Sequence, residues 1–130
     1  MNPSIQEYNE KWETNETTIC SLLSSFIEKH LTQSEGKIWH AHPVWFINEN
    51  PIVGYSIQKR GVRLMFWSGA DFDENKLCVV GKKFKDASVF YNAVSEINLI
   101  DLERWLKKSS VIQWDYKNIV KRKGALIRLS

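Results

Sequence analysis

The strongest constraint on the fold is a change in the spacing of apolar residues along the chain. In the first part they recur every three or four positions, at Ile19, Leu22, Leu23, Phe26, Ile27 and Leu31. This spacing predicts an amphipathic helix, which Gly36 would follow. Further on, Val62, Leu64 and Phe66 alternate with Arg63, Met65 and Trp67. Such alternation predicts a half-buried β-strand.

Shorter patterns predict the other elements. Ser4 and Glu7 have the spacing of a capping box for a short first helix, and Asn15 can cap the second. Further strands are predicted over residues 38–40, 44–47, 52–58, 77–80 and 88–91. Asn98 can cap a helix that buries Leu102 and Trp105. A last helix is predicted from Ile112, Tyr116, Ile119 and Val120, with Gly124 ending it and a short strand or arm after it.

This order of elements predicts an α+β fold. We expect an antiparallel β-meander of about five strands, with the N-terminal and C-terminal helices packed on one face. The other face is then free to be solvated or to bind a ligand. At 130 residues, the chain is expected to form one domain, residues 1–130.

The charge and the cysteines limit the classes of partner. The net charge is only +3, and residues 116–130 hold five basic residues and no acid. We therefore expect a basic C-terminal segment on a slightly acidic domain, and no nucleic acid partner. The polar N-terminus and the absence of a long apolar run predict a cytoplasmic protein without a membrane segment. Cys20 and Cys78 are expected to be buried thiols.

One segment combines aromatic and histidine side chains. Three of the six tryptophans lie in the meander, close to His40 and His42. In an extended segment the two imidazoles would point to the same face. They could contact a ligand, or they could bind backbone groups near the bend at Pro43. A zinc site is disfavoured because it needs three or four protein ligands.

Arg63, Met65 and Trp67 should share the face opposite the core. An aromatic face that carries an arginine and a nearby histidine suits a small planar or anionic ligand. Alternatively, this face is a second core layer, covered by the terminal helices or by a dimer partner. The candidate ligand-binding residues are Trp39, His40, His42, Trp45, Arg63 and Trp67.

Two charged loops resemble known motifs only in part. Asp71-Phe72-Asp73-Glu74-Asn75 begins like a calcium loop, but lysines stand where that loop needs its glycine and its last glutamate. Asp71 and Asp73 remain weak candidates for iron or magnesium, against a solvated acidic loop. Residues 81–85 lack the phosphate-loop pattern and form a basic connector or a loose anion site. Since no catalytic motif is complete, we do not expect an enzyme.

Several segments resemble the YdhG-like family of domains of unknown function. They are residues 37–46, 50–55 and 63–69, with 81–87 and 114–119 fitting one bacterial branch. The resemblance implies a small cytosolic α+β protein, and some members are described as frataxin-like iron-binding proteins. Iron is therefore a cofactor that the resemblance implies. Frataxins are similar in using an acidic helix, and the first helical region here carries Glu7, Glu10, Glu13 and Glu16.

The functional expectation is non-enzymatic binding of a metal ion or a small ligand near His40, His42 and Trp67. The alternative is a protein-interaction module, acting as a homodimer through an exposed aromatic sheet face.

Overall fold

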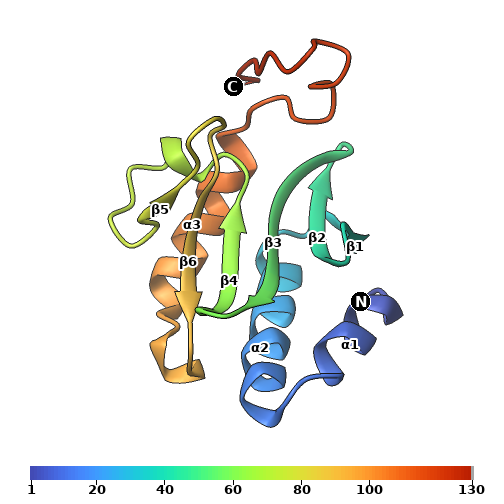
Figure 1. Cartoon of the computed structure of the whole chain (residues 1–130), viewed down its shortest axis with the longest axis vertical. Helices are drawn as coiled ribbons and strands as arrows, with labels where there is room; N and C mark the ends of the chain where they lie inside the picture. The colour runs from blue at the N-terminus through green and yellow to red at the C-terminus, as the bar shows by residue number, and fades with distance from the viewer. Residues whose placement is uncertain (130) are drawn as a thin grey trace.

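The computed structural model describes residues 1–129 (Figure 1). Its helices are α1 (Pro3–Glu10), α2 (Thr14–His30) and α3 (Leu99–Val111). Its strands are β1 (Glu35–Trp39), β2 (His42–Ile47), β3 (Asn50–Gln58), β4 (Gly61–Phe66), β5 (Val79–Val80) and β6 (Ala87–Tyr91). Short 3-10 turns occupy Gly69–Asp71 and Val94–Glu96.

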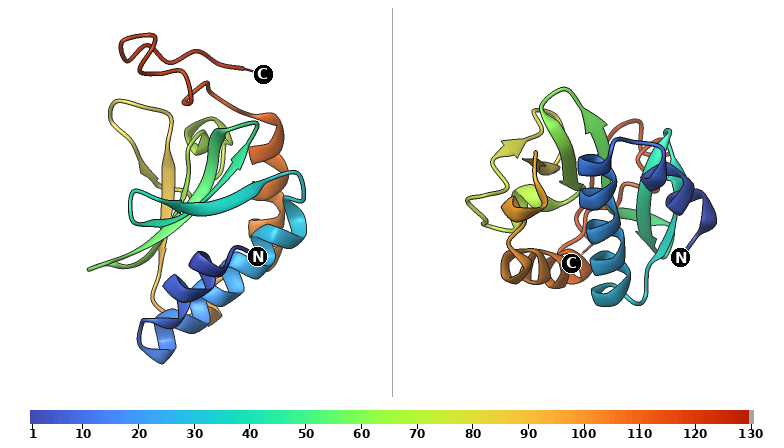
Figure 2. Two further views of the ribbon diagram at one scale, coloured as in Figure 1. Left: turned by 90° about the vertical axis from the view of Figure 1, so that its right-hand side faces the viewer. Right: turned by 90° about the horizontal axis from the view of Figure 1, so that it is seen from below.

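The strands form one antiparallel sheet in the order β1-β2-β3-β4-β6-β5. The three helices pack on one face of it, as Figures 1 and 2 show. The predicted fold class is therefore confirmed, with six strands in place of about five. Among the described residues, no helix is long and apolar enough to cross a membrane.

The core lies between this sheet face and the helices. Val62, Leu64 and Phe66 of β4 are buried in it, whereas Arg63 and Met65 are half-buried on the other face. Alternate side chains of a strand point to opposite faces, so the period-2 pattern predicted this division correctly.

The predicted starts of the first two helices are wrong. The first helix is capped by Asn2, whose side chain accepts a hydrogen bond from the Ser4 backbone N at 2.8 Å. Pro3 fits the first helical position because it has no N–H to satisfy. The second helix begins at Thr14 after Glu13, and Asn15 instead donates to the Asn92 carbonyl at 2.8 Å.

The predicted last helix is also wrong. After α3 the chain runs through turns, with an antiparallel bridge between Trp114 and Arg128. The segment leaves the helical path because its polar groups find partners elsewhere, beginning with the Asp115 N–H, which donates to the Ile127 carbonyl at 2.7 Å. Val120, one residue of the predicted apolar stripe, is 86% exposed.

The two cysteines differ in their surroundings. Cys20 is a buried residue of α2, as predicted, but Cys78 is exposed. It lies just before the two-residue strand β5, which is the edge strand of the sheet.

Candidate functional site

The β1–β2 hairpin determines where the two histidines lie. His40 and Ala41 form a two-residue turn with φ angles of +52° and +71°, and Trp39 pairs with His42 across it. Positive φ at both central positions is typical of a type I′ hairpin turn. The predicted extended segment, with both imidazoles on one face, is therefore wrong at His40. The turn instead places Trp39 and His42 on the same face as cross-strand partners.

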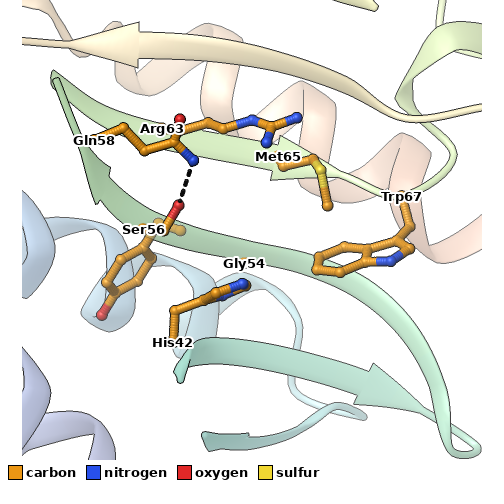
Figure 3. A pocket seen from close by; sticks show the side chains of 8 residues that line it. His42, Gly54, Ser56, Gln58, Arg63, Met65 and Trp67 are labelled. Carbon is orange, nitrogen blue, oxygen red and sulfur yellow. Dashed lines mark hydrogen bonds between the residues drawn. The ribbon is translucent and has the colours of Figure 1, made fainter. Parts of the chain in front are cut away.

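A cavity of about 180 Å³ opens on the sheet face opposite the helices (Figure 3). Its lining comes from β2, β3, β4 and the residue after β4: His42, Gly54, Tyr55, Ser56, Gln58, Arg63, Met65 and Trp67. The rings of His42 and Trp67 lie on either side of Gly54, and Met65 points toward the space between them (Figure 3). We call this space the open-face cavity.

Gly54 allows the strands and the indole to approach closely. A Cβ atom at this position would lie 2.6 Å from the Pro43 carbonyl oxygen and 3.3 Å from Cζ3 of Trp67. Without a side chain here, Trp67 can lie across β3 and pack against Trp39, with ring centroids 6.2 Å apart. Gly54 therefore forms the floor of the cavity and allows the Trp67 ring to form one of its walls.

Burial favours the neutral form of His42. Burial lowers its pKa below the ordinary value, and the nearby charges of His40 and Arg63 act in the same direction, against an opposing hydrogen bond to the Pro43 backbone. Its Nδ1 atom is buried and has no hydrogen-bond partner of good geometry. The site thus contains an imidazole whose neutral form burial favours, with its Nδ1 atom enclosed by the surrounding chain.

Arg63 supplies the positive charge of the cavity. Its Nε donates to Ser88 Oγ at 2.8 Å, and Nη2 lies 3.6 Å from Asp86 Oδ2. Among residues 1–129, Nη1 has no hydrogen-bond partner. The guanidinium is therefore anchored from one side and retains donors for an anion.

The structure separates the other predicted ligand-binding residues. Trp45 is fully buried on the helix face, where its Nε1 donates to Glu28 Oε2 at 2.5 Å, so it belongs to the core and not to the cavity. Trp39 and His40 line a different and larger space beside the C-terminal segment. His42, Arg63 and Trp67 are the predicted residues that come together.

The acidic loop offers poor metal ligands. Asp71 Oδ2 accepts a hydrogen bond from Trp114 Nε1 at 2.6 Å and lies 3.8 Å from Arg128 Nη1, while Asp73 is exposed. Within residues 1–129 no three His, Cys, Asp or Glu side chains lie close enough to hold a metal ion. The donor groups present do not fit the iron that the family resemblance implies.

Other residues that line the open-face cavity follow the same alternation as β4. Gly54 and Ser56 alternate with Val53, Tyr55 and Ile57, so the face they share was readable from the sequence. Gln58 follows the same alternation, and its Nε2 donates to Ser56 Oγ at 3.1 Å.

Comparison with known proteins supports the fold. No family model matches the chain, and no curated protein is similar to it at a significant level. The architecture, a six-stranded antiparallel sheet with helices on one face, is found in a solved structure. That structure is YdhG from Bacillus subtilis, a protein of the DUF1801 family. It matches with a TM-score of 0.59 over 93% of this chain and 90% of that chain, at 11% sequence identity. The likeness establishes a shared YdhG-like fold.

Proposed function

We propose that the protein is a non-enzymatic, cytoplasmic binding protein of the YdhG-like family, and that the open-face cavity holds a small anionic molecule with a planar part. The observation that carries the proposal is that the His42 ring, the Arg63 guanidinium and the Trp67 ring line one cavity. The shared fold with YdhG supports the family, and two free cysteines, one of them exposed, suit a reducing compartment.

Each side chain has a distinct part in this function. Arg63 pairs with the negative group through its free donors, and charge-assisted bonds of this kind are the strong ones. Trp67 and Met65 contact the planar part. A volume of about 180 Å³ is below the usual range for drug-sized ligands, which favours a molecule of one ring or less.

A titration with benzoate, a small planar carboxylate, tests the proposal. In two-dimensional amide NMR spectra we expect shifts at Gly54, Ser56 and Arg63. Arg63→Gln should weaken binding about tenfold because it removes a charge-assisted hydrogen bond. Arg60→Gln is the matched control, since its guanidinium lies over the Phe90 ring, 4.3 Å from the centroid, and outside the cavity.

Equal benzoate affinity in Arg63→Gln and the unmodified protein would contradict the proposal. Calorimetric titration with ferrous iron and with zinc tests the metal alternative. Tight binding of either metal, together with no binding of benzoate, would favour a metal ligand over an organic anion.

The homodimer alternative has one observation in its favour. Trp39, at the edge of the aromatic face, is 36% exposed, so part of this face is available to a partner. Sedimentation velocity over a range of protein concentrations tests it, and a monomer at every concentration would exclude it.

A further inference from the structure

We propose a second binding site, for a phosphate-bearing planar ring of the nucleoside monophosphate class. It occupies the space between the β1–β2 hairpin and residues 116–121, which we call the hairpin cavity. This inference is independent of the function proposed for the open-face cavity, because the two cavities share no lining residue.

The hairpin cavity is large enough for such a ligand. Its volume is about 830 Å³, within the range of small-molecule sites in proteins. One wall carries Trp39, His40 and Phe46 from the hairpin, and the other is the C-terminal segment from Tyr116 to Lys121. That segment runs beyond one end of the sheet (Figure 1).

Trp39 provides a stacking surface. Its ring packs against three others, with centroid distances of 4.2 Å to His40, 5.4 Å to Phe46 and 6.2 Å to Trp67. It is nevertheless 36% exposed. A ring that is already held in place loses little conformational freedom when a second ring stacks on it, and stacking of a base on an aromatic side chain is favourable for every base.

The charge of the lining fits a phosphate. Three lysines, Lys37, Lys117 and Lys121, face one acid, Glu49. Lys117 Nζ donates to the Asn48 carbonyl at 3.1 Å, and Lys121 has no hydrogen bond or ion pair with residues 1–129. A concave site lined by one sign of charge concentrates ligands of the opposite sign.

The C-terminal wall is held in place by long-range contacts. Asn50 Oδ1 accepts from the backbone N–H of Tyr116 at 2.9 Å and of Lys117 at 3.1 Å. Arg122 pairs with the buried Asp115, whose carboxylate also accepts from Asn118. The cavity is therefore bounded by anchored chain on both sides.

A free nucleotide suits this site better than a nucleic acid strand. The excess of two positive charges in the lining matches one phosphate, whereas tight binding of a strand needs many phosphate contacts. Outside residues 116–130 the chain has more acidic than basic residues. The part of a nucleic acid strand that extends beyond the cavity would therefore find little electrostatic attraction.

Calorimetry with adenosine 5′-monophosphate tests the proposal on the full chain. Adenosine and ribose 5-phosphate, which each lack one half of the ligand, should bind at least tenfold more weakly. Trp39→Leu should weaken binding of the monophosphate about tenfold. Lys121→Gln should weaken it severalfold and reduce the dependence of affinity on salt. Lys123→Gln is the matched control, because this exposed lysine of the same segment does not line the cavity.

Each of the following outcomes would overturn the proposal: no binding of the monophosphate, equal affinity in Lys121→Gln and Lys123→Gln, or much tighter binding of a single-stranded oligonucleotide. Thermal denaturation shows whether Trp39→Leu is folded, and Lys121→Gln provides the test if it is not. Arg63→Gln should retain full affinity for the monophosphate, and loss of affinity in that variant would show that the ligand occupies the open-face cavity instead.

Discussion

At the scale of single residues, His42 shows how a strand position becomes a titrating site. Burial lowers its pKa, whereas in the unfolded chain the imidazole takes up a proton near pH 6.5. At pH values between the pKa of His42 in the folded chain and that in the unfolded chain, the unfolded chain binds more protons than the folded chain. The stability that His42 contributes is therefore present above about pH 6.5 and is lost as the pH falls below it.

The His42→Gln variant should lose less stability on acidification than the unmodified protein does. The reason is that glutamine has no proton to take up in either state. Urea unfolding at about pH 7.5 and about pH 5.5 measures the difference. The His40→Asn variant is the matched control. It changes the exposed histidine of the turn, at a positive φ that asparagine tolerates. An equal loss of stability in His42→Gln and the unmodified protein would contradict the prediction.

At the scale of elements, one carboxylate ties the loop after β4 to α3. Glu74 has only 8% of its side chain exposed and accepts hydrogen bonds from Arg104 at 2.6 and 2.8 Å, Trp105 at 2.8 Å and Lys108 at 2.6 Å. Chiefly because of the Arg104 guanidinium, the pKa of this carboxyl is held well below its usual range. All three partners of the Glu74 carboxylate belong to α3. Because their hydrogen bonds use its oxygens, this acidic loop residue stabilises the fold.

Glu74→Gln should lower the free energy of unfolding by about 1–2 kcal/mol at neutral pH, since charge-assisted bonds are lost while an acceptor for Trp105 remains. A carboxyl with a lowered pKa stabilises the fold above its unfolded pKa, near 4.5, and this contribution disappears as the pH falls. The variant should therefore show a flatter decline of stability below about pH 4.5.

Urea unfolding across this pH range measures both effects of Glu74→Gln. Glu7→Gln on the exposed side of α1 is the matched control. Equal acid sensitivity of the Glu74 and Glu7 variants would show that the contacts to α3 contribute little.

At the scale of the whole molecule, Asn50 joins the sheet to the C-terminal segment. It is 2% exposed, its Nδ2 donates to the Trp114 carbonyl at 2.9 Å, and its Oδ1 accepts from Tyr116 and Lys117. Tyr116 adds a second connection, since its hydroxyl donates to the Trp67 carbonyl at 2.6 Å. Asn50 at the start of β3 and Trp67 just after β4 therefore both hold the wall of the hairpin cavity.

Asn50→Ala should release the segment without unfolding the sheet. The amides of Tyr116 and Lys117 should lose protection in hydrogen exchange, and stability should fall by about 1–3 kcal/mol as buried polar groups lose their partners. Asn75→Ala, in an exposed loop, is the control. Unchanged protection at Tyr116 in Asn50→Ala would show that other contacts are sufficient.

Much of the fold and part of the site could be predicted from local patterns. The stripe from Ile19 to Leu31 and the alternation from Val62 to Trp67 report which face is buried, because burial of apolar side chains follows the period of the element. The same alternation predicted that Arg63 and Trp67 would share the open face. The helix starts and the helix over 112–123 were wrong because capping atoms and distant hydrogen bonds compete with the local pattern.

The sequence by itself determined the fold class, the core face of the main strands and the association of Arg63 with Trp67, since these depend on spacing alone. Only the tertiary structure decided that His40 turns away from His42, that Trp45 is a core residue and that residues 113–129 form no helix. These outcomes depend on which distant groups satisfy a buried polar atom or fill a gap in the packing. The spacing of residues along the chain contains no record of those partners.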